Sequence, residues 1–300
     1  MAARPYHFHV LDVFTERRYE GNPLAVVLGA DDLSGTAMQA IAAEFNLSET
    51  IFVMAPREEG HEARVRIFTP RYEMAFAGHP TVGCAIHLAE RHWPKGRIDE
   101  TLVLEEDAGP VAVQVTRLEG RMRATFTAPV VPGPIGLSPD PHALARALHL
   151  DPADIREDHP LAAHEGGPRF LYVPLNDVDA LARARPLGPG WRDAVPADCH
   201  SVYCYAPGGE EGVDYRARMF APDAGINEDP ATGSASAIFA SQLLAGGALA
   251  EGTTTLTLRQ GVEMGRPSEI GVEADVEGGA LTAVRISGSA VRVSDGQILA

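Results

Sequence analysis

The chain has 300 residues, of which 45% are hydrophobic and 22% charged, and its formal charge at pH 7 is −16. This length suits two domains, and the composition is that of an ordinary globular protein. Because nucleic acids and anionic membranes attract basic proteins, we expect neither as a partner of such an acidic chain. The three cysteines, the lack of a signal-peptide pattern and the lack of a long apolar run predict a cytoplasmic protein without disulfides.

The first part of the chain alternates predicted strands with two predicted helices. Ser34 caps a helix that extends to about Asn46 and has an apolar face. A second helix begins at Gly78 or His79, and it carries no charge from residue 80 to residue 89. Pro80 suits the first turn of that helix, where its missing N–H group is not needed. Strands are expected at residues 6–14, 23–28, 50–55, 63–69, 101–105, 110–117 and 121–127. The face of the first helix that we expect to be buried comprises Met38, Ile41, Ala42 and Phe45.

A proline-rich segment, residues 128–141, is the best domain boundary in the chain. Beyond it we expect a short helix at 142–149 and a second uncharged helix at 234–245. The strands predicted in this half are residues 170–174, 202–206, 215–221, 254–259, 270–276, 281–286 and 290–293.

One segment occurs twice. Residues 64–70 read Arg-Val-Arg-Ile-Phe-Thr-Pro, and residues 216–222, 152 positions later, read Arg-Ala-Arg-Met-Phe-Ala-Pro. Each copy leads through a glycine-containing turn into one of the uncharged helices. A duplicated strand–turn–helix unit predicts a pseudo-two-fold cleft in which two helix starts face one ligand. Free N–H groups and positive dipole ends at those starts favour a small anionic metabolite.

The two uncharged helices also predict the fold class. A helix that is apolar on all sides must be surrounded by other structure, and the short strands before and after each helix can provide it. We therefore expect an α+β fold of two similar units, each a curled sheet around a buried helix. Two ordinary α+β sandwiches are the alternative.

Several polar residues lie where chemistry is expected. Glu49 stands between a helix and an apolar strand, where partial desolvation would suit a proton carrier, although a solvated loop carboxylate is the simpler interpretation. His79 could exchange protons with a ligand as a neutral ring, or could pack or cap the helix. Asp229 and Ser234 flank a tight turn and could orient a polar substrate or act as caps. His7 and His9 lack a third ligand, so we predict no metal site.

Ten short motifs occur in an order that resembles a known family: Asp12–Phe14, Gly21–Pro23, Asp32–Ser34, Asn46–Glu49, Arg66–Pro70, Phe76–Pro80, Gly167–Arg169, Arg218–Phe220, Glu228–Ser234 and Gln260–Pro267. They resemble the PhzF-like (phenazine biosynthesis protein) isomerase family, whose fold is that of diaminopimelate epimerase. The resemblance covers nearly the whole chain. It implies two domains, residues 1–128 and 129–285, each a β-barrel-like sheet around a central helix. It also implies that residues 286–300 return to the first domain and that the protein is a homodimer.

The resemblance implies an isomerase that moves a proton between carbons of a small carboxylate-bearing substrate, such as a dihydro-hydroxyanthranilate-like compound, without a cofactor. In the phenazine enzyme a glutamate moves the proton, and the matching residue is Glu49. The implied catalytic residues are Glu49, His79 and Asp229. The implied substrate-binding residues are Ser48, Gly78, Gly233, Ser234 and Gln260.

Racemases with this fold use two cysteines at the helix starts, and neither Cys84, Cys199 nor Cys204 lies there, which argues against two-thiol chemistry. An epimerase or hydro-lyase acting on an amino-acid-like metabolite, with Asp229 or His79 as the second group, stays open. So does a metabolite-binding protein without catalysis.

Overall fold

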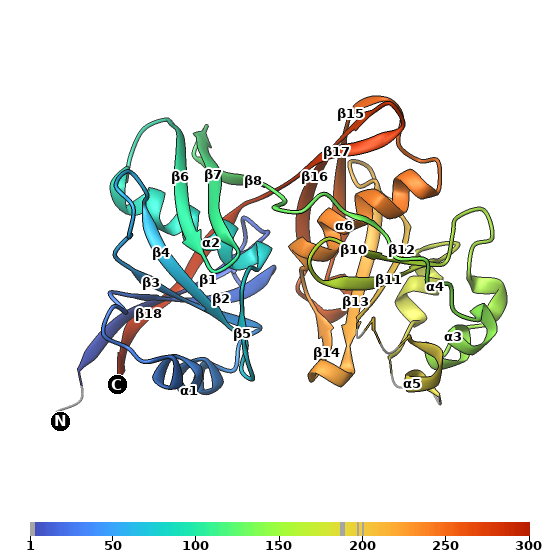
Figure 1. Cartoon of the computed structure of the whole chain (residues 1–300), viewed down its shortest axis with the longest axis horizontal. Coiled ribbons are helices and arrows are strands. Elements are labelled where there is room, and N and C mark those ends of the chain that lie inside the picture. The colour runs from blue at the N-terminus through green and yellow to red at the C-terminus, as the bar shows by residue number, and fades with distance from the viewer. Residues whose placement is uncertain (1–3, 187–189, 197, 200) are drawn as a thin grey trace. The chain divides into compact units, whose positions relative to one another are not determined.

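The chain divides into two compact units that combine strands and helices (Figure 1). A computed structural model describes residues 4–186, 190–196, 198–199 and 201–300. Unit 1 comprises the chain up to Pro129 together with Ser287–Ala300, and unit 2 comprises Val130–Ile286. Each unit has a curled, open sheet and one long apolar helix, so the predicted α+β class is confirmed. In the described residues no helix is both long and apolar enough to span a bilayer.

The sheet of unit 1 runs in the order β18–β1–β2–β3–β4–β6–β7–β8. The pairs β2–β3 and β4–β6 are parallel, the other pairs are antiparallel, and β5 pairs with β4. The helices of this unit are α1 (Gly35–Phe45) and α2 (Gly78–His92). Its strands are β1 (Pro5–Val13), β2 (Asn22–Leu28), β3 (Glu49–Met54), β4 (Ala63–Phe68), β5 (Glu73–Met74), β6 (Ile98–Glu106), β7 (Gly109–Leu118), β8 (Arg121–Thr127) and β18 (Ala290–Leu299).

The sheet of unit 2 includes the order β9–β10–β11–β12–β13–β15–β16, with β14 paired to β13. Strand β17 (Ala280–Gly288) leads the chain back toward its last residues, which belong to unit 1. The helices are α3 (Pro141–Ala147), α4 (Val178–Arg183), α5 (Trp191–Ala194) and α6 (Gly233–Ala245). The other strands are β9 (Gly133–Pro134), β10 (Ala162–Glu165), β11 (Arg169–Pro174), β12 (Val202–Pro207), β13 (Tyr215–Ala221), β14 (Ile226–Asp229), β15 (Gly252–Gln260) and β16 (Ser268–Glu277).

The two units have the same strand connections, so the predicted repeat is confirmed. Strands β1–β7 of unit 1 correspond in order to β10–β16 of unit 2. The parallel pairs β2–β3 and β4–β6 have their counterparts in β11–β12 and β13–β15. The connection from the repeated sequence (residues 64–70 and 216–222) to its helix is three residues longer in unit 2. Gly78 at the start of α2 therefore corresponds to Gly233 at the start of α6.

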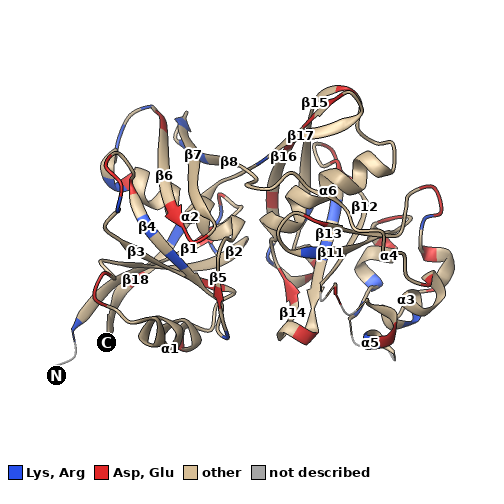
Figure 2. Cartoon of the chain, viewed as in Figure 1, with Lys and Arg blue, Asp and Glu red and all other residues tan. Residues whose placement is uncertain are grey.

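The two uncharged helices are buried as the sequence predicts. Every residue of α2 from Gly78 to Ala89 is buried, and the helix contacts strands β1, β2, β3, β6, β7, β8 and β18. Helix α6 is buried over most of its length and carries no charged residue (Figure 2). Helix α2 continues to His92, three residues beyond the predicted uncharged stretch, because its last residues reach the surface, where Arg91 and His92 are exposed.

Short elements are where the sequence-based prediction fails. Strands β5, β9, β10 and β14 and helices α4 and α5 were not expected, and none is longer than six residues. Segments of this length show too little of a period to be recognised. For α1, the Ser34 cap is confirmed, since its side chain accepts a hydrogen bond from the N–H of Ala37 at 3.2 Å. Of the predicted apolar face of α1, Phe45 is only partly buried.

Gly83 of α2 gives a test of how tightly the sheet surrounds this helix. A Cβ atom at residue 83 would lie 2.6 Å from Leu24 Cδ2 and 2.7 Å from Val13 Cγ2. We expect Gly83→Ala to lower the free energy of unfolding by about 1–3 kcal/mol, because two buried side chains must move. Urea denaturation measures this change. Gly133→Ala is the control, since a Cβ there would meet no atom within 4 Å. Equal stability of the Gly83 variant and the wild type would contradict the packing described.

Candidate active site

Glu49 and His79 meet in unit 1. Glu49 is the first residue of β3, and its Oε2 atom lies 3.1 Å from Nδ1 of His79, the second residue of α2. The side chains of Glu49 and His79 are 13% and 4% exposed. The carboxylate is therefore largely removed from water, unlike a solvated loop carboxylate. The parallel pairing of β2 with β3 sets this position, because it aligns Glu49 with Leu24, two residues after the buried Asn22.

Burial keeps the His79 ring neutral. It lowers the pKa of His79 to about 3, and a backbone hydrogen bond with Pro23 opposes this shift. At neutral pH the Glu49 carboxyl group therefore lies against an uncharged imidazole. The Nδ2 atom of Asn22 lies 3.5 Å from the same ring nitrogen. The ring is held between an amide and a carboxyl group, which limits its rotation and that of Glu49.

Asp229 lies in unit 2, at the end of β14, and begins the turn into α6. Its Oδ2 atom accepts a hydrogen bond from the Thr232 hydroxyl at 2.5 Å, and the residue is only 7% exposed. Gln260, at the end of β15, is fully buried. Its Nε2 atom donates to the carbonyl of Asp229 at 2.8 Å and to Thr232 Oγ1 at 3.0 Å. These contacts make Gln260 a support of the turn.

The structure thus places the predicted residues in two groups, one in each unit. Glu49 and His79 contact one another in unit 1, where Ser48 precedes Glu49 in the chain. Gly78 is the first residue of α2, and Gly233 and Ser234 are the first two of α6. Because the first N–H groups of a helix have no partner within it, these positions can offer backbone donors to an anion.

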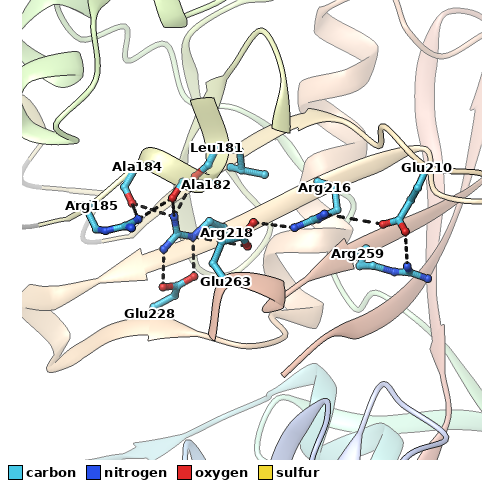
Figure 3. Close-up of polar contacts among 10 residues, drawn as sticks. All are labelled: Leu181, Ala182, Ala184, Arg185, Glu210, Arg216, Arg218, Glu228, Arg259 and Glu263. Carbon is cyan, nitrogen blue, oxygen red and sulfur yellow. Dashed lines mark hydrogen bonds and ion pairs between the residues drawn. The ribbon is translucent and has the colours of Figure 1, made fainter. Parts of the chain in front are cut away.

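Arg218 of β13 holds the strand that carries Asp229 (Figure 3). Its Nε and Nη2 atoms donate to the two carboxylate oxygens of Glu228, both at 2.8 Å. Its Nη1 atom donates to the carbonyls of Leu181 and Ala184, near the end of α4, at 3.0 and 2.9 Å. The side chain is only 4% exposed. Arg218 therefore joins α4 to the residue next to Asp229.

Two neighbouring ion pairs extend this contact toward the Gln260 side of the turn. Arg216 Nη2 donates to Glu263 Oε1 at 2.7 Å, and Glu263 follows Gln260 by three residues. Arg259 Nη1 donates to Glu210 Oε2 at 2.8 Å (Figure 3). Charged contacts thus lie beside both Asp229 and Gln260, the residues at the turn between β14 and α6.

The same arginine–glutamate pair occurs in unit 1. Arg66 donates to the two carboxylate oxygens of Glu73 at 2.5 and 2.7 Å. Arg66 and Arg218 each lie over the phenylalanine two residues later in the chain, at 5.1 and 4.9 Å from the ring centroid. Both arginines belong to the repeated segment, but the sequence alone predicted no role for them. The repeated Arg-x-Phe pattern, followed by a glutamate, is the signal that could have identified them.

The cysteines are poorly suited to acid–base chemistry. Cys84, Cys199 and Cys204 are free and buried. Burial raises the pKa of Cys204 to about 12 and raises the pKa of Cys84 far above its ordinary value. These thiols remain protonated at neutral pH, which agrees with the expectation that thiolate racemisation is not the chemistry of this chain.

Removal of the Arg218 side chain tests its role in unit 2. We expect Arg218→Met to lower the free energy of unfolding by about 3–5 kcal/mol, because Glu228 and the α4 carbonyls lose a buried partner. Chemical denaturation measures the change. The control is Arg192→Met, which removes the ion pair of an arginine that is 84% exposed and should cost less than about 1 kcal/mol. Equal effects in the two variants would contradict the assignment.

The neutrality of His79 predicts a pH dependence of stability. The pKa of His79 is about 3 in the folded chain against 6.5 for the free group, so the unfolded chain binds the proton more readily. Its contribution to stability is therefore complete above pH 6.5 and is lost as the pH falls toward 3. We expect the wild type to lose about 2 kcal/mol more than His79→Gln between pH 7 and pH 5. Urea unfolding at both values measures this. Equal losses would show that the ring is not buried as a neutral group.

Comparison with known proteins gives a consistent assignment. The family described as "Phenazine biosynthesis-like protein" matches residues 11–296. An uncharacterised isomerase of Mesorhizobium japonicum is 44% identical over 97% of this chain and 98% of its own. A trans-2,3-dihydro-3-hydroxyanthranilate isomerase of Pseudomonas chlororaphis is 37% identical over 98% of this chain and 99% of its own. The crystal structure of a PhzF-family phenazine biosynthesis protein of Bacillus anthracis superposes with a TM-score of 0.89 at 28% identity, covering 99% of this chain and 100% of the other. The chain belongs to the phenazine biosynthesis-like protein family.

Proposed function

We propose that this chain is a cofactor-independent isomerase that moves a proton between two carbons of a small carboxylate-bearing substrate, with Glu49 as the proton carrier. Its class as an isomerase follows from relatives that match almost its full length and are named isomerases. The observation that supports Glu49 is its contact with the buried ring of His79 at 3.1 Å. Such a carboxylate has a fixed orientation and little access to water, and both properties suit proton transfer at carbon.

In this proposal Oε2 of Glu49 rests against Nδ1 of the neutral His79 ring, which limits the rotation of the carboxylate. The second oxygen of Glu49 is then the base that removes a proton from one carbon of the substrate. The negative charge that develops on the substrate is stabilised by N–H groups at the start of α2, beginning with Gly78. Glu49 returns the same proton to a second carbon, so the reaction consumes neither acid nor base overall.

We assign the binding of the substrate's polar groups in unit 2 to Asp229, Gly233 and Ser234. The support for this assignment is the rigid turn between β14 and α6, in which Thr232 and Gln260 hold Asp229. The substrate class is proposed by analogy with the Pseudomonas chlororaphis relative, which is named for a dihydro-hydroxyanthranilate. Ser48, next to Glu49, is proposed as a further contact to the substrate.

Glu49→Gln tests this function. With trans-2,3-dihydro-3-hydroxyanthranilate in deuterated buffer, we expect kcat to fall by about 10²–10⁴-fold, because the amide cannot accept the proton. Substrate binding, measured by calorimetry, should persist, since the amide has nearly the same shape. The control is Glu44→Gln, which changes an exposed glutamate of α1 in the same way and should leave kcat unaltered. Full turnover by Glu49→Gln would remove Glu49 from the mechanism.

A further inference from the structure

Glu106 is a buried carboxyl group that the proposed proton transfer does not use. It is the last residue of β6, whose Leu102 and Leu104 face the core, and it occupies the next core-facing position of the strand. Only 7% of the residue is exposed. A carboxylate in such a position would be strongly destabilised unless it were neutral or well paired.

Its contacts show which form it takes. Thr81 Oγ1, in the first turn of α2, lies 2.6 Å from Glu106 Oε1 and 2.8 Å from the carbonyl oxygen of Ala77. The threonine hydroxyl has one hydrogen, and a carbonyl can only accept. Both contacts are hydrogen bonds only if Thr81 donates to Ala77 and a protonated Glu106 donates to Thr81.

Ala77 is the residue that this arrangement holds. It is the N-cap of α2 and has no side-chain group that could cap the helix. The Thr81 hydroxyl and the Thr81 N–H both donate to the carbonyl of Ala77, at 2.8 and 3.2 Å, and so fix the residue that directly precedes Gly78 and His79. A shift of Ala77 would move the His79 ring that contacts Glu49.

Unit 2 contains the same device with a different partner. Ser236, which corresponds to Thr81, donates to the carbonyl of Thr232 at 2.9 Å, and Thr232 is the N-cap of α6. The phenol oxygen of Tyr203 lies 3.4 Å from Ser236 Oγ. The partner of the helix-start hydroxyl is thus a phenol in unit 2 and a carboxyl group in unit 1. Because a hydroxyl donates to the carbonyl of the N-cap residue in both units, we infer that this hydrogen bond helps to form the helix start.

We propose that Glu106 is a positioning residue for the start of α2: as a neutral acid it donates to Thr81, which in turn holds Ala77 and hence His79. When Glu106 loses its proton, the Thr81 hydrogen turns to the carboxylate, and the carbonyl of Ala77 keeps only its hydrogen bond from the Thr81 N–H at 3.2 Å. We therefore expect the start of α2 to be ordered at neutral pH, where Glu106 is protonated, and to loosen at alkaline pH, where it is not. The consequence for turnover rests on the proposed function, whereas the consequence for the helix start does not.

The charges around Glu106 agree with this assignment. Burial raises the pKa of Glu106 to about 8, and the neighbouring Asp107 adds to the shift. From α2, the titratable group near Glu106 is Cys84, whose pKa is also raised by Glu106 and by Glu62. The acidic neighbours therefore favour the neutral form. Since a free glutamate titrates near 4.5, the folded chain loses stability as the pH rises from 4.5 through about 8.

Glu106→Gln tests the proposal, because the amide keeps a donor for Thr81 but cannot ionise. We expect the melting temperature of the wild type to fall between pH 7 and pH 9 and that of the variant to fall much less. NMR signals of the His79 ring should shift with pH near 8 in the wild type and stay constant in the variant. With the substrate named above, kcat/KM of the wild type should fall about tenfold per pH unit above the transition, whereas the variant should retain its rate.

Two further measurements test whether Glu106 is the group that titrates. Tyr203→Phe, which changes the corresponding contact of unit 2, should show the same alkaline transition as the wild type. The infrared band of a neutral carboxylic acid should be present in the wild type at pH 7, disappear above pH 8 and be absent in Glu106→Gln. The same alkaline transition in the His79 signals of the wild type and of Glu106→Gln, or the absence of the infrared band, would overturn the proposal. If no protein turned over the substrate, the proposed function would fail, while the melting, NMR and infrared results would still decide the role of Glu106.

Discussion

The structure depends on the burial of one uncharged helix inside each curled sheet. Helix α2 is buried on every side over its first twelve residues, so strands from all parts of unit 1 must cover it. The same constraint acts on α6 in unit 2. A helix enclosed in this way exposes its polar backbone only at its ends. The start of each helix is therefore where N–H groups, buried hydroxyls and acidic side chains collect.

This constraint explains why the polar residues at the helix starts are so thoroughly held. His79 and Asp229 are both almost fully buried, and each has a hydrogen-bonding partner that limits its orientation, Asn22 for His79 and Thr232 for Asp229. Each unit also has a partly buried ion pair, between Arg66 and Glu73 in unit 1 and between Arg218 and Glu228 in unit 2. A reacting group held in this way loses little further freedom on binding a substrate, which favours catalysis. Both units thus contain the same arginine–glutamate pair, whereas the polar residue at the helix start differs, being His79 in unit 1 and Asp229 in unit 2.

Much of the candidate site was predictable because its residues lie in motifs close to predicted elements. From the sequence alone Glu49 could be placed just before a strand, His79 at the start of a helix, and Asp229 in the turn before a helix. The role of Gln260 could not, because its partners Asp229 and Thr232 lie about thirty residues earlier in the chain. Glu106 was missed for a related reason. Its core-facing position becomes evident only when β6 is aligned with its neighbours and Thr81 is seen to oppose it.

By itself the sequence determined the α+β class, the repeat, the two buried helices and the family resemblance. These properties follow from local patterns, since hydrophobic period, uncharged stretches and motif order are all read along the chain. Only the tertiary structure decided that His79 is neutral, that Arg218 joins α4 to β14, and that a carboxyl group lies against the first turn of α2. Each of these depends on burial or on contacts between distant segments, and the free energy of a buried polar group is set by the partners that folding brings to it.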